Sequence, residues 1–194
     1  IKDPGPLRHA SAGSDTVPSM PGFADHVDGS FGEAWSGDVP NGSHVNLVIG
    51  RRGSQTAAAA AAAFASPGPG HAPVMACLGA GNAVRPATIV LNKATVASDL
   101  HGRITWGAAQ LGIAEGVMDA VDDGVIDPAD AGELVILVAV WVDPAASDET
   151  AVRAANRDAA RRALDDALQG DRRDRIGELL ALRGSATNAF YSGR

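Results

Sequence analysis

The chain has 194 residues and a formal net charge of −7, and 45% of its residues are hydrophobic. This length predicts one domain, or one domain plus a tail, and the composition is sufficient for a globular core. No cluster of lysine and arginine forms a nucleic-acid footprint, and phosphate backbones repel an acidic chain. With Cys77 as its single cysteine, the chain can form neither an intrachain disulfide nor a cysteine-based metal site.

Two further features concern the compartment of the protein. No apolar run reaches the roughly 18 residues of a membrane-spanning helix. The first residues lack a charged segment followed by a long apolar segment, so no signal peptide is predicted. We therefore expect a cytoplasmic protein.

The first half of the chain predicts an arm, several strands and one helix. Residues 1–31 are rich in Pro, Gly, Ser and Asp and keep no sustained period, which predicts an extended arm. Residues 32–37 predict a short strand, and residues 43–50 (SHVNLVIG) a strand with one well-buried face. The alanine run at 54–65 predicts a thin helix that can lie close to a sheet. Two more strands are predicted after this helix, at residues 72–80 and 87–96.

The second half alternates helices with one very apolar strand. Residues 104–126 keep helical spacing of apolar side chains, and Gly124 is a stop signal. Residues 133–143 (ELVILVAVWVD) are rich in Val and Ile, which predicts a central strand. Residues 147–170 open with a Ser/Asp cap and predict a charged amphipathic helix. One more helical turn is expected at 176–182.

The order of these elements predicts the fold class. Consecutive strands with no helix between them exclude a simple parallel, doubly wound sheet. We expect an α+β fold in two layers, with helices packed on a mixed or antiparallel sheet. The predicted organisation is an arm at 1–31, a globular domain at 32–170 and a tail at 171–194.

Candidate reactive side chains lie on two of the predicted strands. His44 begins an apolar strand and shares a face with Asn46, since residues two apart in a strand point the same way. By the same rule Lys93 and Thr95, in LNKATV, share a face if that segment is a strand. Lys93 interrupts an apolar run, so its ammonium group either reaches toward a sheet edge or lines a cleft.

Gln110 stands near the start of the long helix, among small neighbours. Its amide suits a ligand with polar ring edges, although a surface glutamine on a helix is the simpler interpretation. The glycine-rich stretches lack the spacing of a phosphate loop or dinucleotide fingerprint, and no serine nucleophile elbow is present. We predict no metal site, because no metal-ligand spacing links the other histidines, which are His9, His26, His71 and His101.

Six segments in order resemble the formaldehyde-activating enzyme family, from about residue 32 to residue 170 with little gapping. This resemblance implies a fold like the second domain of ribosomal protein S5. It also implies a homo-oligomer, a ring of five subunits with the site between neighbours. The segments are GEAWSGD, SHVNLVIGRRGS, PATIVLNKAT, WGAAQLGIAEGVMDAVDDGVI, ADAGELVILVAVWVDPAASD and NRDAARRAL.

The resemblance also implies an activity and a set of site residues. Family members join formaldehyde to tetrahydromethanopterin, giving methylene-tetrahydromethanopterin and water, which we place with the carbon–nitrogen lyases. The carrier is a substrate, and neither a metal nor a nicotinamide is required. The family's catalytic histidine falls on His44, and its substrate-binding positions fall on Asn46, Met75, Lys93, Thr95 and Gln110.

Three departures from the family pattern leave alternatives open. Many members have Asp where this chain has Asn46, and an amide cannot raise the pKa of the histidine as a carboxylate would. We therefore expect Asn46→Asp to raise activity and to move its pH optimum upward. Trp106 replaces a Phe, and Asp143 replaces a His at a strand end. The alternatives are a non-catalytic ring that binds a pterin or folate or senses formaldehyde, and a purely structural oligomer.

Overall fold

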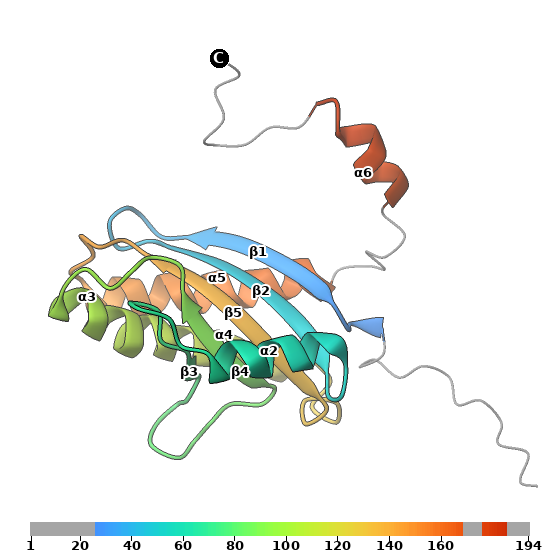
Figure 1. Cartoon of the computed structure of the whole chain (residues 1–194), viewed down its shortest axis with the longest axis horizontal. Coiled ribbons are helices and arrows are strands. Elements are labelled where there is room, and N and C mark those ends of the chain that lie inside the picture. The colour runs from blue at the N-terminus through green and yellow to red at the C-terminus, as the bar shows by residue number, and fades with distance from the viewer. Residues whose placement is uncertain (1–25, 169–175, 186–194) are drawn as a thin grey trace, which may run out of the picture.

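A five-stranded sheet forms the centre of the molecule (Figure 1). The structure is a computed structural model that describes residues 26–168 and 176–185. The strand order is β1-β2-β5-β4-β3, and all neighbours are antiparallel except β4 and β5, which are parallel. The sheet is mixed, which confirms the predicted sheet type, and β5 is its central strand, as predicted for residues 133–143. The strands are β1 (Ser30–Ser36), β2 (Ser43–Arg51), β3 (Val74–Met75), β4 (Ala87–Asn92) and β5 (Leu134–Val142).

The helices lie on both faces of this sheet but cover them unequally. In Figure 1, α4 and α5 lie behind the sheet, and α2 crosses one end of the front face. The sheet and its helix layer confirm the two-layer α+β class, while the likeness to ribosomal protein S5 stays a prediction. The helices are α2 (Gln55–Ala65), α3 (Asp99–Arg103), the π-helical turn η1 (Ile104–Ala109), α4 (Gln110–Asp122), α5 (Glu149–Leu168) and α6 (Ile176–Leu182).

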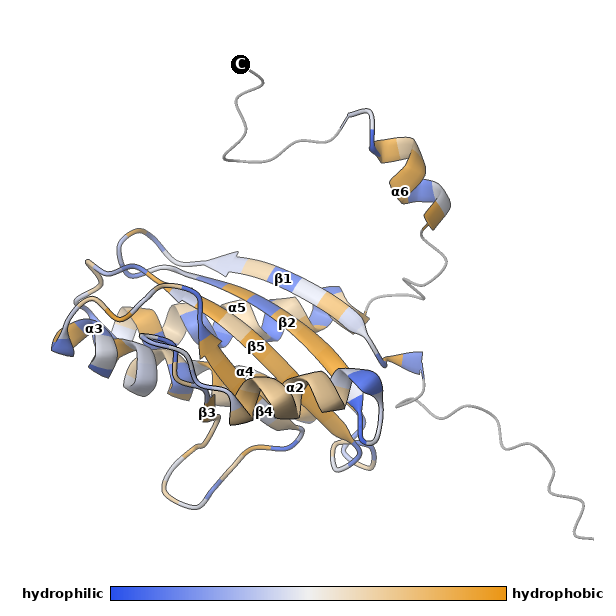
Figure 2. Ribbon diagram, viewed as in Figure 1, coloured by the Kyte–Doolittle hydropathy of each residue, from blue (hydrophilic) through white to orange (hydrophobic). Residues whose placement is uncertain are grey.

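Burial along the strands follows this unequal cover. In β2, Val45 and Leu47 face the helix layer and are fully buried, whereas Val48 faces the other side and is half-buried. β5 is apolar at every position and alternates in the same way. Figure 2 shows the hydrophobic colour running along β4, β5 and the second half of β2. Among the described residues, no helix combines the length and apolar character needed to cross a membrane.

Two glycines let α4 and α5 pack with their backbones in contact. A Cβ atom at Gly112 would lie 2.2 Å from the carbonyl oxygen of Arg153, and one at Gly116 would lie 2.4 Å from that of Arg157. No real side chain tolerates such distances, so any larger residue must push the helices apart. The close spacing between α4 and α5 therefore depends on glycine at both positions.

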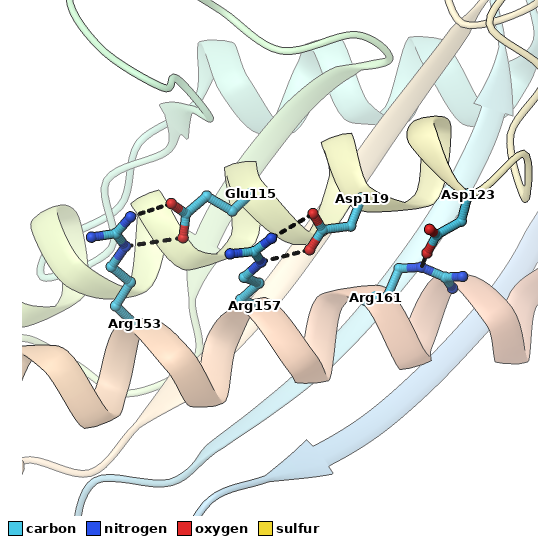
Figure 3. Close-up of polar contacts among 6 residues, drawn as sticks. All are labelled: Glu115, Asp119, Asp123, Arg153, Arg157 and Arg161. Carbon is cyan, nitrogen blue, oxygen red and sulfur yellow. Dashed lines mark hydrogen bonds and ion pairs between the residues drawn. The ribbon is translucent and has the colours of Figure 1, made fainter.

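Arginines of α5 neutralise acids of α4 along the outer edge of this contact (Figure 3). Arg157 donates two hydrogen bonds to the carboxylate of Asp119, at 2.6 and 2.7 Å. These bonds hold the pKa of Asp119 below its ordinary value, and those from Arg153 do the same for the pKa of Glu115. The three pairs are Arg153–Glu115, Arg157–Asp119 and Arg161–Asp123.

Several element boundaries differ from the sequence prediction. The helix expected at 104–126 begins earlier, at the Ser98 cap, and includes the π-helical turn before α4. It ends at Asp122, and Gly124 takes a φ of 75° just beyond it, as the stop signal predicted. The strand expected at 72–80 is reduced to the two residues of β3. The first strand begins at Ser30, two residues before the predicted start.

The two ends of the chain lie mostly outside the described residues. Of the predicted arm at 1–31, the structure describes only the last six residues, and of the predicted tail at 171–194 it describes 176–185. The helical turn expected at 176–182 is present as α6, which buries none of its residues. The boundaries predicted for arm and tail therefore stay predictions.

Candidate functional site

The sheet topology brings two predicted site residues to one end of the sheet face that lies opposite α4 and α5. We call this face the open face. His44 stands at the start of β2, and Lys93 directly follows the end of β4. The central strand β5 runs antiparallel to β2 and parallel to β4, so the start of β2 and the end of β4 meet. The backbone N–H of Lys93 still donates to the carbonyl of Val140, which holds its position beside β5.

His44 lies between the carboxylate of Glu33 and the amino group of Lys93. Its Nε2 lies 2.6 Å from Oε1 of Glu33 on β1, and its Nδ1 lies 3.2 Å from Nζ of Lys93. An ammonium group can only donate, so Nδ1 accepts and Nε2 carries the hydrogen that is donated to Glu33. The geometry therefore places a hydrogen on Nε2, facing Glu33, and the lone pair of Nδ1 toward Lys93.

Lys93 stands in a half-buried position beside that ring. Burial lowers the pKa of Lys93, and the negative charge of Glu33 opposes the shift. The amide oxygen of Asn46 accepts a hydrogen bond from the same Nζ atom. The structure thus brings three of the predicted site residues together, namely His44, Asn46 and Lys93.

Asn46 contacts Lys93 through its amide oxygen, which accepts a hydrogen bond from Nζ. The sequence predicted that Asn46 binds substrate and tunes the imidazole of His44 less strongly than an Asp would, and both roles stay predictions. The carboxylate that Asn46 does not supply comes from Glu33, which the sequence analysis did not select. Glu33 pairs with Asn46 across β1 and β2 and so lies diagonal to His44. In the sequence, Glu33 alternates with two aromatic residues of β1, and this pattern could have indicated a shared face. The register of β1 against β2, which places Glu33 beside His44, could not be known from it.

Two tryptophans form a wall beside the histidine, and both were missed as site residues. The rings of Trp35 and Trp141 have centroids 5.5 Å apart, and that of Trp35 is 6.1 Å from the ring of His44. Trp35 is exposed over 42% of its surface, so a flat ligand ring has access to it. The register that pairs Trp35 with His44, and His44 with Trp141, creates this wall.

Thr95 does not share a strand face with Lys93, because β4 ends at Asn92. The side chain of Asn92 donates to the carbonyls of Gly70, at 2.8 Å, and Ala94, at 2.6 Å, and the chain bends there. Thr95 lies instead 3.4 Å from Nε2 of His71, a residue of the preceding loop. The strand predicted at 87–96 was therefore four residues too long, and the argument from a shared face was wrong.

Met75 and Gln110 of a given subunit lie away from His44 of the same subunit. Met75 is half-buried on β3, opposite Ile89 and therefore at the level of Leu137 along β5. Gln110 begins α4 and donates to the carbonyl of Cys77 at 2.9 Å. It also lines a cavity of about 490 Å³ on the helix side, together with Arg103, Gly107, Glu149 and Arg153.

Asp143 and Trp106, the other two departures from the family pattern, lie in separate parts of the structure. Asp143 accepts a hydrogen bond from the backbone N–H of Ala145 at 2.8 Å, so it shapes the turn after β5. Trp106 lies half-buried in the π-helical turn and lines a shallow hollow with Val96 and Arg103. The side chains that contact His44 and Lys93, besides each other, are those of Glu33, Asn46 and Trp35. Within residues 26–168 and 176–185, no three histidine, cysteine or acidic side chains are grouped to hold a metal ion.

Comparison with known proteins gives a consistent family. The model of the family described as formaldehyde-activating enzyme matches residues 31–191. A protein of Methanosarcina barkeri named 5,6,7,8-tetrahydromethanopterin hydro-lyase is 35% identical over 159 residues, which cover 82% of this chain and 88% of the relative. Proteins of Methanothrix thermoacetophila and Archaeoglobus fulgidus, each named bifunctional enzyme Fae/Hps, are 34% and 33% identical over 72% of this chain.

These similarities differ in how much of each relative they cover. This chain spans 36% and 35% of the two bifunctional enzymes, so it corresponds to one part of them. The name of the Methanosarcina barkeri relative, hydro-lyase, denotes cleavage of a carbon–oxygen bond, whereas the sequence analysis expected a carbon–nitrogen lyase. With the family model matched over most of its length, the chain belongs to the formaldehyde-activating enzyme family.

Proposed function

We propose that this chain condenses formaldehyde with tetrahydromethanopterin and releases methylene-tetrahydromethanopterin and water. Family membership and the name of the Methanosarcina barkeri relative support the reaction and the carrier. The observation that carries the proposal is the position of His44. Its ring is held between the carboxylate of Glu33 and the ammonium of Lys93, on an accessible face of the sheet.

The reaction needs a proton donor at one step. A nitrogen that adds to formaldehyde forms a carbinolamine, which must then lose its hydroxyl group. Hydroxide is a poor leaving group, so protonation of that oxygen accelerates the loss of water. His44 supplies this proton, because imidazole both gives and takes protons near neutral pH. Glu33 orients the ring through its contact with Nε2.

The remaining residues bind and orient the pterin. Trp35 and Trp141 offer an aromatic wall against which a flat ring stacks, and 42% exposure of Trp35 leaves it accessible. Asn46 and Lys93 hold polar edges of the ligand, and Met75 adds an apolar contact. Holding the reacting atoms in place contributes strongly when the uncatalysed condensation is already appreciable.

Thr95 and Gln110 join this site from a neighbouring subunit in our proposal. The ring of five subunits implied by the family resemblance supports this, as does the position of Gln110 on the helix side of its own chain. Sedimentation analysis of the purified protein tests the ring, and a monomeric species would contradict it. We also propose a cytoplasmic location, since a chain with one cysteine requires no oxidising compartment.

The experiment compares the protein-catalysed rate with the spontaneous rate. Purified protein is mixed with formaldehyde and tetrahydromethanopterin, and the methylene product is followed over time. We expect acceleration by the wild-type chain and an activity about 10²–10⁴-fold lower for His44→Ala. His26→Ala is the matched control, because His26 lies on the surface before β1 and outside the site.

Two outcomes would contradict the proposal. A wild-type rate equal to the spontaneous rate, with pterin still bound, would favour the non-catalytic binding protein. Equal activities of His44→Ala and His26→Ala would remove His44 from the reaction. Both kinds of relative are named as enzymes, so they give the non-catalytic alternative no support.

A further inference from the structure

Lys93, His44 and Glu33 have the arrangement of a nucleophile, its base and the group that orients the base. Nζ of Lys93 lies 3.2 Å from Nδ1 of His44, and Nε2 of the same ring lies 2.6 Å from Oε1 of Glu33. The same logic activates serine and cysteine nucleophiles in other enzymes. Here the first position holds an amine, the type of group that adds readily to an aldehyde.

The surroundings of Lys93 favour loss of its proton to His44. Its two hydrogen-bond partners are the imidazole of His44 and the amide of Asn46, and only the imidazole can take a proton. Because residue 46 is an amide, no carboxylate binds Nζ directly at this position. Burial lowers the pKa of Lys93, and Glu33, which opposes the shift, acts from the far side of the ring.

The side chains around this amine are partly exposed to solvent. The side chains of His44 and Glu33 are 31% and 50% exposed, so the arrangement lies at the surface of the open sheet face. Lys93 itself is half-buried, which keeps its amine fixed next to the base. An amine that is held beside a base and close to solvent is what capture of a carbonyl compound requires.

We propose that Lys93 captures formaldehyde covalently and passes it to the pterin as a methylene iminium group. The lysine nitrogen forms a bond to the carbonyl carbon after its proton has moved to His44. His44 gives that proton to the oxygen, then takes a second proton from the lysine nitrogen and gives it to the hydroxyl group, so the carbon–oxygen bond breaks and water leaves. One pterin nitrogen attacks the methylene carbon, and its proton passes through His44 to the lysine nitrogen. A second pterin nitrogen bonds to the same carbon as the carbon–lysine bond breaks, and its proton restores Lys93 to its starting form.

This sequence of steps balances without any other reactant. Each methylene group transferred releases one water, and no atom is oxidised or reduced. His44 acts first as a base and then as an acid, and it ends in its starting form. The inference rests on the proposed function only for the identity of the acceptor, because capture of formaldehyde by Lys93 needs no pterin.

Reductive trapping tests the capture directly. The full-length protein is treated with formaldehyde and cyanoborohydride without pterin, and an iminium group is thereby converted to a methyl group on the nitrogen. The sequence contains two lysines, Lys2 and Lys93, so peptide mass mapping separates methyl groups on Lys93 from those on the peptide that carries Lys2. Free Nα-acetyl-lysine in the same tube provides a reference for an ordinary amine.

We expect Lys93 to be methylated faster than the free reference amine and faster than Lys2. His44→Ala should slow labelling of Lys93 about 10²-fold, since it removes the base. Glu33→Gln keeps the hydrogen-bond acceptor and removes the charge, so we expect a smaller loss, about tenfold. Neither variant should change labelling of Lys2, which reports whether the reagents act equally on each protein.

Lys93→Arg separates covalent capture from simple charge. Arginine keeps the positive charge and cannot form the iminium, so condensation should fall to the spontaneous rate while circular dichroism stays native. An accelerated condensation in Lys93→Arg would overturn the inference and leave the proposed function intact. So would labelling of Lys93 at the rate of the reference amine. Fast labelling of Lys93 without any condensation would uphold capture and overturn the proposed function.

Discussion

The contact between α4 and α5 and the open face of the sheet use charged side chains in opposite ways. Along the helices Glu115, Asp119 and Asp123 each meet an arginine, which stays protonated at all relevant pH values. On the open face one carboxylate, Glu33, serves a histidine and, through it, a lysine. Complete pairing fixes the charges of the first region. Incomplete pairing leaves a proton in the second region that can move between His44 and Lys93.

The largest expected difference between the two faces of the sheet is in packing. Val45→Ala removes a fully buried side chain under the helices and should lower the free energy of unfolding by about 2–3 kcal/mol. Val48→Ala makes the same change on the half-buried face and should cost about 1 kcal/mol or less. Urea denaturation of both variants measures this, and equal losses would mean that the open face is covered in solution.

An intermediate effect is expected at Asn46, and it reverses the expectation drawn from the sequence. Asn46→Asp would place a carboxylate on the ammonium of Lys93, which raises the pKa of Lys93 and lowers the fraction of free amine. Formaldehyde trapping and condensation at neutral pH should fall about tenfold and recover as the pH rises. A higher rate at neutral pH would instead support a direct effect on His44.

The smallest effect is expected at the paired helices. The pKa of Asp119 is held below its ordinary value of 3.8, so its contribution to stability is present above that value. It is lost as the pH falls through the lowered pKa. Since Arg157 is half-exposed, we expect only about 0.5–1 kcal/mol. We therefore expect the difference in urea midpoint between wild type and Asp119→Asn to be smaller at about pH 3 than at about pH 6. A constant difference between the two proteins would show that the pair does not titrate.

The fold was predicted best where one pattern dominates. The alanine run gave α2, and the Val- and Ile-rich run gave the central strand β5, each within one residue of its ends. Prediction failed where the chain leaves a strand through side-chain bonds. The apolar residues 72–80 continue past the two paired residues of β3, and Asn92 ends β4 by bonding the carbonyls of Gly70 and Ala94. Hydropathy does not report either event.

The site was predicted only as far as the family motif reached. His44, Asn46 and Lys93 do lie together, but the contact between Asn46 and Lys93 was not foreseen. Glu33 and Trp35 were missed, because their place beside His44 follows from the register of β1 against β2. Register depends on the whole sheet, so short patterns in the sequence do not fix it.

The arginines that line the α4–α5 contact also bear on how the protein tolerates an aldehyde substrate. Of its 16 basic side chains, 14 are arginine, and a guanidinium that never loses its proton offers no lone pair for attack on a carbonyl. Within the part of the chain that the structure describes, Lys93 is the single primary amine on a side chain. A scaffold charged in this way gives formaldehyde few places to form crosslinks, and its surface keeps its charge while the molecule works.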